Sequence, residues 1–135
     1  MRRRELREQI FKLLFRVEFN KPEEMPEQLR YFFEDDELTA TELEQAEIEV
    51  KFQKILDKLA QIDEMLNEKT SGWSVERMGK VDVAILRLAV YEICFDEDVP
   101  TVVAINEAVE LAKRFGQEES SSFINGVLAK FADKA

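Results

Sequence analysis

The stretch VDVAILRLAVYEI, residues 81–93, decides the fold class. Apolar residues occupy nearly every side of a helix drawn through it, and its charged residues are Asp82, Arg87 and Glu92. A helix that is apolar all round is buried by neighbours on every side. The stretch therefore predicts a central helix in an all-α domain, with the other helices packed around it.

Two further helices are predicted after this stretch. The segment FDEDVPT, residues 95–101, ends the central helix, and Pro100 suits the first turn of the next one. That helix is expected to end at Gly116 in a left-handed cap. A last helix is expected to begin near Glu119 and Ser120. Its residues predicted to be buried are Ile124, Val127, Leu128 and Phe131.

A long helix is predicted before the stretch, beginning at a cap formed by Thr39 or Thr41 and ending at about Lys69. Its apolar residues recur in steps of four and three, which indicates one packing face. They are Ile48, Phe52, Ile55, Leu59, Ile62 and Leu66. Val50, Leu56 and Met65 widen this face beyond a coiled-coil seam. We therefore favour packing inside a bundle, and a coiled-coil dimer is the competing interpretation.

An amphipathic helix is predicted at the start of the chain, and KTSGWS, residues 69–74, separates the long helix from the central one. The apolar residues Leu6, Ile10, Leu13, Leu14 and Val17 line one face of the first helix. We predict one all-α domain over residues 1–135, made of a helical half at 1–70 and a second at 71–135.

The composition argues against most catalytic sites. The 135 residues include no histidine and one cysteine, Cys94, so an internal disulfide and the usual zinc spacings are absent. The commonest general base is absent as well. The longest apolar runs are too short to cross a bilayer. We therefore expect a cytoplasmic protein that is not an enzyme, with no cofactor, no metal and no membrane contact.

The first seven residues hold four arginines, Arg2, Arg3, Arg4 and Arg7, although the net charge of the chain is −10. Charged residues interrupt this segment at helical spacing, which excludes a secretory signal. Cations at a helix N-terminus oppose the helix dipole, so helix stability does not explain them. Arginine suits forked contacts to phosphate, which indicates a nucleic-acid contact. The competing interpretation is a solvated basic helix end.

A second candidate is the segment FGQEESSSFINGVL, residues 115–128. On the predicted last helix, Phe123 lies at the flank of the buried face, within the first turn. Such a phenylalanine is usually the edge of the core. Beside three serine hydroxyls and a helix N-terminus, it could also stack on an unpaired base.

Residues 76–131, ERMGKVDVAILRLAVYEICFDEDVPTVVAINEAVELAKRFGQEESSSFINGVLAKF, resemble the C-terminal half of the bacterial NusB family of transcription antitermination factors. The segment RRRELREQIFKLLF, residues 2–15, resembles the arginine-rich first helix of that family. The resemblance covers essentially the whole chain, and residues 20–50 match in character rather than in letters. It implies an all-α fold of two three-helix halves.

The resemblance also implies a function. Members of the family bind the boxA element of ribosomal RNA leader transcripts together with the ribosomal protein NusE, within an RNA polymerase antitermination complex. Carried onto this chain, the RNA-binding residues would be Arg2, Arg3, Arg4, Arg7, Lys113, Glu119, Ser120 and Phe123. The resemblance implies that the central helix contacts the protein partner, and Asp82 is the candidate contact residue.

Three alternatives remain open from the sequence. Glu5 interrupts the basic run, and Ser121 and Ser122 stand where the family often has a basic residue, so the RNA footprint could be shifted. A helical scaffold that binds only protein is the second interpretation. The fold also forms the RNA-binding front of certain ribosomal RNA methyltransferases. The oligomeric state, monomer or homodimer, is undetermined.

Overall fold

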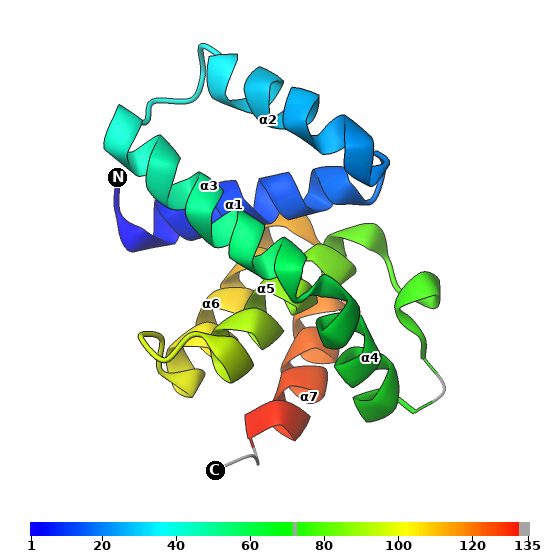
Figure 1. Ribbon diagram of the computed structural model, residues 1–135. Helices are drawn as coiled ribbons and strands as arrows, with labels where there is room; N and C mark the ends of the chain where they lie inside the picture. The colour runs from blue at the N-terminus through cyan, green and yellow to red at the C-terminus, as the bar shows by residue number, and fades with distance from the viewer. Residues whose placement is uncertain (72, 133–135) are drawn as a thin grey trace.

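A computed structural model describes residues 1–71 and 73–132 of the chain. These residues form seven α-helices and two short 3-10 helices, with no strand among them (Figure 1). The α-helices are α1 (Arg3–Val17), α2 (Met25–Glu34), α3 (Glu42–Asp57), α4 (Leu59–Lys69), α5 (Lys80–Phe95), α6 (Thr101–Phe115) and α7 (Ser120–Ala132). The 3-10 helices are η1 (Pro22–Glu24) and η2 (Val75–Arg77). The all-α prediction is confirmed.

Helix α5 is the centre of the molecule, as its sequence predicts. Every residue from Val83 to Glu92 is buried, and the helix packs against α1, α4, α6 and α7. In Figure 1, α1 and α2 lie above α5, α3 crosses in front of it, and α7 extends below it. A single hydrophobic core includes residues of all seven α-helices. The central helix therefore contacts helices from both halves of the sequence.

Two of the three charged residues of the central stretch are ion-paired inside the fold. The Arg87 guanidinium donates to both carboxylate oxygens of Asp63 on α4, at 2.8 Å each, and it also pairs with Glu18 at the end of α1. Burial disfavours the charge of Arg87, but these carboxylates outweigh it, so the pKa of Arg87 is raised. Glu92 pairs with Arg7 and Lys51. These contacts connect α5 to α1, α3 and α4.

The predicted long helix is divided in two. At Lys58 the backbone leaves helical geometry, with φ −105° and ψ 3°, and α3 ends there while α4 begins at Leu59. The predicted packing face survives the break, because its residues are buried on both helices except for the half-buried Leu59. Val50, however, is 55% exposed, so it does not pack inside the bundle as expected. The apolar face read from the sequence is therefore wider than the part of α3 that contacts other helices.

The first helix forms as predicted and buries four residues: Ile10, Phe11, Leu13 and Leu14. Helix α3 begins with the side chain of Thr41 accepting a hydrogen bond from the backbone N–H of Glu44, whose carboxylate accepts one from the N–H of Thr41. The boundary between halves at residues 70 and 71 stays a prediction. Gly72, on which that prediction partly rested, and residues 133–135 lie outside the described residues.

Candidate nucleic-acid interface

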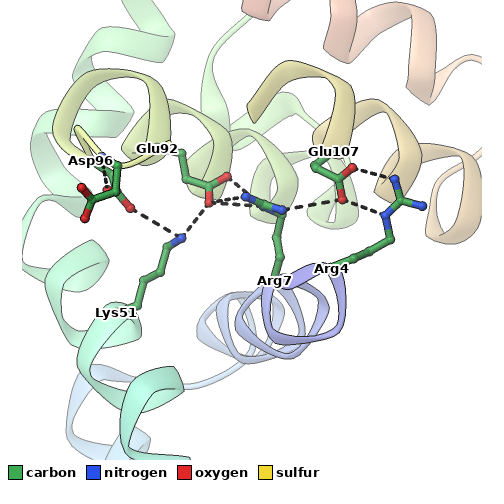
Figure 2. Close-up of polar contacts among 7 residues, drawn as sticks. Arg4, Arg7, Lys51, Glu92, Asp96 and Glu107 are labelled. Carbon is green, nitrogen blue, oxygen red and sulfur yellow. Dashed lines mark hydrogen bonds and ion pairs between the residues drawn. The ribbon is translucent and has the colours of Figure 1, made fainter. Parts of the chain in front are cut away.

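The tip of α1 presents three exposed arginines, Arg2, Arg3 and Arg4. Within the described part of the chain, the side chains of Arg2 and Arg3 have no hydrogen bond or ion pair. Arg4 differs, because its Nε and Nη2 donate to Oε1 and Oε2 of Glu107 on α6, at 2.9 and 2.7 Å (Figure 2). Its side chain is nevertheless 63% exposed. Arg4 is therefore held in place and still open to solvent.

Arg7, one turn further along α1, is enclosed by the fold. Its Nε and Nη2 donate to the carboxylate of Glu92, at distances of 3.0–3.2 Å, and its Nη1 lies 3.6 Å from Oε1 of Glu107. Lys51 of α3 donates to the same Glu92 at 2.7 Å and lies 3.7 Å from Asp96 (Figure 2). Glu92 is 1% exposed and Arg7 10%. This chain of alternating charges joins α1, α3, α5 and α6.

A surface groove between α6 and α7 contains Arg4 and Lys113, which the sequence analysis singled out. Its volume is about 440 Å³, and α7 contributes Ser121, Ser122 and Asn125 to its wall. We call it the α6–α7 groove. Both cations have an acidic neighbour in the groove: Glu107 beside Arg4, and Glu110 with its Oε2 3.4 Å from the Nζ of Lys113. The groove thus offers hydrogen-bond donors rather than a large excess of positive charge.

The N-terminus of α7 opens onto this groove. The backbone N–H groups of Ser121 and Ser122 have no hydrogen-bond acceptor among the described residues. Unpaired N–H groups at a helix N-terminus favour an anion through their donors and the helix dipole. Arg4 and Lys113 therefore share the groove with two free backbone donors and two serine hydroxyls.

Gly116 and Ser120 shape this turn by close packing. Ser120 is buried, and its Oγ accepts a hydrogen bond from the backbone N–H of Gln117 at 2.9 Å. A Cβ on Gly116 would come within 2.6 Å of Ser120 and 2.8 Å of the Ala112 carbonyl oxygen. With φ −91° and ψ −173°, Gly116 is extended, so the left-handed cap expected from the sequence is wrong. Glycine is required there because the chain passes too close to α7 for a side chain.

The remaining predicted residues meet in a second hollow, on the other side of the first turn of α7. Its volume is about 270 Å³, and Asp82, Glu119, Ser120 and Phe123 line it. The half-buried Phe123 ring lies 6.3 Å from the ring of Trp73, at 59° to it. Asp82, expected to mark a protein contact, therefore shares a hollow with Phe123, expected to contact RNA. We call it the Trp73–Phe123 hollow.

Arg3 lies apart from both of these places. It lines a different depression, between α1, α3 and the connection from α5 to α6. Of the other charged residues that line it, Glu47, Asp96 and Asp98 are acidic, whereas Arg7 and Lys51 are basic. The depression is therefore mixed in charge. The four arginines of the first turns thus do not form one surface: Arg4 faces the α6–α7 groove, Arg3 faces this second depression, and the side chain of Arg7 is almost entirely buried.

The sequence analysis did not assign a binding role to Trp73 or Asn125. Trp73 is 56% exposed and lies against Phe123, while Asn125 lines the α6–α7 groove. The sequence held a signal for Trp73, because it is the one tryptophan of the chain and follows a polar boundary segment. For Asn125 the signal is weaker, since it depends on where α6 packs.

The Arg4–Glu107 pair favours the charged form of each partner. Hydrogen bonding to Glu107, supported by its charge, raises the pKa of Arg4. Hydrogen bonding to Arg4 lowers the pKa of Glu107 against the effect of partial burial. The two shifts agree in direction, as expected for an ion pair. Both groups are charged at neutral pH.

Across residues 1–71 and 73–132, no cluster of three or more cysteine, aspartate or glutamate side chains is arranged to hold a metal ion. Over the same residues, no helix combines the length and hydrophobicity required to cross a membrane.

Comparisons with known proteins agree with the sequence resemblance. Residues 4–133 match the model of the NusB family. The transcription antitermination protein NusB of Agathobacter rectalis is 53% identical over 133 residues, which cover 98% of this chain and 100% of that protein. The NusB protein of Acetivibrio thermocellus is 43% identical over 130 residues, covering 96% and 88%.

Solved structures give the same result. A NusB structure from T. maritima superimposes with a TM-score of 0.88 at 36% identity, covering 99% of this chain and 92% of that chain. The protein in a crystal structure of the antitermination factors NusB and NusE in complex with double-stranded RNA superimposes with a TM-score of 0.80. At 21% identity, with 98% and 97% of the two chains covered, that match supports the fold alone. The chain belongs to the NusB family of transcription antitermination proteins.

Proposed function

We propose that this protein is a cytoplasmic, RNA-binding transcription antitermination factor. It binds boxA-type single-stranded RNA together with the ribosomal protein NusE, as part of an antitermination complex with RNA polymerase. Family membership supports the regulatory, non-enzymatic role. The observation that carries RNA binding is the placement of Arg4, Lys113 and the N-terminus of α7 in one groove, with Trp73 and Phe123 beyond the same helical turn.

The phosphates are bound in the α6–α7 groove. Arg4, Lys113 and the free N–H groups of Ser121 and Ser122 are the donors, and Arg2 adds positive charge from the exposed tip of α1. Backbone N–H groups, hydroxyls and cations are the usual partners of phosphate oxygens. These donors also answer the question raised by Ser121 and Ser122, because a helix N-terminus can take the place of a basic side chain at this position.

The bases are bound in the Trp73–Phe123 hollow. Single-stranded RNA is recognised by stacking its unpaired bases on aromatic rings. The exposed ring of Trp73 and the half-buried ring of Phe123 lie side by side, with Ser120 and Glu119 at the edge. An RNA strand that crosses the first turn of α7 would contact phosphate donors on one side and aromatic rings on the other.

Arg7 acts through the fold rather than through the RNA. Its side chain is 10% exposed and its donors are directed to Glu92 and Glu107. Arg3 is assigned no phosphate contact, because it lies outside the α6–α7 groove, over a depression that already contains three carboxylates. Asp82 is assigned to the protein partner at the edge of the aromatic hollow, where the partner and the RNA would meet.

The affinity for RNA alone should be modest. The net charge of the chain is −10, and each groove cation has a carboxylate beside it. A net negative protein repels a polyanion over the range set by salt screening. The protein partner is therefore expected to supply part of the binding energy.

A titration of fluorescently labelled boxA RNA tests the proposal, with this protein alone and with NusE, at low salt. We expect binding in both cases, strengthened by NusE, and weaker binding to a scrambled RNA of equal length. If neither mixture binds RNA, the proposal is wrong. If the protein binds NusE while neither mixture binds RNA, it is a scaffold that binds only protein, which was the second interpretation of the sequence.

A further inference from the structure

Glu107 holds one edge of the Arg4 guanidinium and leaves the other edge open. The carboxylate takes the side-on edge, formed by Nε and Nη2. The end-on edge, formed by Nη1 and the second hydrogen of Nη2, has no acceptor among the described residues. A guanidinium can bind one oxyanion at each edge. Arg4 can therefore bind a phosphate without leaving Glu107.

The position of Glu107 is itself determined by the buried ion pairs. Its side chain is 14% exposed, and its Oε1 lies 3.6 Å from Nη1 of Arg7. Arg7 in turn is held by Glu92, which is 1% exposed (Figure 2). The Arg4 side chain is thus anchored, through Glu107 and Arg7, to the core of the molecule.

We propose that Glu107 is a positioning residue for RNA binding, which aims the open edge of Arg4 at a backbone phosphate in the α6–α7 groove. This inference rests on the proposed function. Arginine has a long side chain with many rotamers, and ordering it on binding costs affinity. Glu107 orders Arg4 before RNA arrives. A carboxylate close to the phosphate would therefore increase affinity, although its charge alone predicts the opposite.

Two opposing effects decide the outcome of removing Glu107. Loss of its negative charge raises the local potential and favours RNA, but this effect is weakened by salt in an exposed groove. Loss of the paired hydrogen bonds frees Arg4 and disfavours RNA. We expect the second effect to dominate. RNA affinity should be about threefold to tenfold lower in Glu107→Gln, which corresponds to the usual free-energy cost of immobilising one side chain on binding.

Glu110 provides the matched control, because it is a second carboxylate in the same groove that does not contact Arg4. It pairs with Lys113 three residues along α6, at 3.4 Å, and its side chain is 45% exposed. Glu110→Gln removes the same charge without freeing Arg4. It also releases Lys113, but this exposed pair orders the lysine only weakly, so RNA affinity should fall less than in Glu107→Gln.

The experiment measures the RNA affinity of both variants in the presence of NusE, each in the unsubstituted protein and in the Arg4→Lys background. A lysine ammonium lacks the planar guanidinium fork, so it cannot bind Glu107 at one edge and a phosphate at the other. We expect Glu107→Gln to weaken RNA binding in the presence of Arg4 and not in the Arg4→Lys background. Glu107→Asp, which keeps the charge but shortens the reach, should also weaken it. Circular dichroism melts confirm that each variant is folded at the temperature of the titration.

If Glu107→Gln binds RNA as tightly as Glu110→Gln, or more tightly than the unsubstituted protein, Glu107 does not position Arg4 and the inference is wrong. An equal loss of affinity in both backgrounds also contradicts it, because the effect would then be structural. Failure of the unsubstituted protein to bind RNA would instead overturn the proposed function, and this inference with it.

Discussion

Arg4 and Arg7 lie one turn apart on α1, and each donates from its Nε and Nη2 to a glutamate, yet their surroundings differ. The side chain of Glu92, which holds Arg7, is 1% exposed and also pairs with Lys51. The side chain of Glu107, which holds Arg4, is 14% exposed, and the Arg4 side chain itself is 63% exposed. Two arginines of one basic motif can therefore have different roles: the buried one supports the fold and the exposed one is available to a ligand.

The largest expected effect is on stability, and it separates the two arginines. Arg7→Ala leaves Glu92 as a buried charge with one partner lost, and breaking a buried pair in this way costs about 3–5 kcal/mol. We expect the free energy of unfolding, measured by urea denaturation, to fall by about that amount. Arg4→Ala is the matched control and should change it far less, because exposed ion pairs contribute little. If the free energy of unfolding fell equally in Arg7→Ala and Arg4→Ala, the two arginines would not differ in their contribution to stability.

The next largest effect concerns the aromatic rings. Stacking of a base on an aromatic side chain contributes about 1–3 kcal/mol. Trp73→Ala and Phe123→Ala should each weaken RNA binding by about that amount, with little change in its salt dependence. Trp73→Ala is the cleaner variant, because Trp73 is 56% exposed whereas Phe123 packs against the core. RNA affinity unchanged in Trp73→Ala would exclude the Trp73–Phe123 hollow as a base site.

A smaller effect distinguishes Arg4 from its neighbour Arg3. Each phosphate contact to a single strand contributes about 0.7 to the slope of log affinity against log salt. We expect Arg4→Ala to flatten the slope by about that amount. Arg3→Ala removes the same charge, but Arg3 does not line the α6–α7 groove, so this variant should flatten the slope less. A larger change for Arg3→Ala than for Arg4→Ala would indicate that the phosphates bind outside the α6–α7 groove.

The smallest effect is the pH dependence of the Arg4–Glu107 pair. Hydrogen bonding to Arg4 lowers the pKa of Glu107 below its ordinary value of 4.5. A lowered pKa in the folded protein contributes stability that is present above the ordinary value and is lost as pH falls through the folded value. The unfolding free energies of the unsubstituted protein and of Glu107→Gln should therefore differ most above about pH 5 and converge in acid. A difference independent of pH would show that this ion pair does not contribute to stability.

The sequence predicts the helices well because their signals are local. The apolar pattern of residues 81–93 identifies the central helix, and the two possible caps, Thr39 and Thr41, locate the start of α3 to within two residues, with Thr41 forming the cap in the structure. The break at Lys58 has no strong local signal, since neither glycine nor proline occurs near it. The exposure of Val50 depends on which helices pack against α3, so periodicity alone assigns it to the wrong environment.

The candidate site is predicted less completely, because its properties depend on distant partners. Arg2, Arg3, Arg4 and Arg7 look equivalent in the sequence, and what separates Arg7 from them is Glu92, 85 residues away. Arg4 is distinguished by Glu107, 103 residues away. The flank position of Phe123 can be read from helical spacing, whereas its contact with Trp73 joins a loop to α7. The sequence thus indicates which residues are candidates for the site. The role of each candidate depends on how α1 packs against α5 and α6.

Phosphate binding at the N-terminus of α7 can be followed through the backbone amides of ¹⁵N-labelled protein by NMR during titration with boxA RNA. A phosphate is expected at the free N–H groups of Ser121 and Ser122. Their resonances should shift most, together with the Nη–H groups that form the open edge of Arg4, while the Nε–H of Arg7 stays unchanged. Shifts centred on Arg3 and the depression that it lines, with Ser121 and Ser122 unaffected, would contradict this placement of the phosphate.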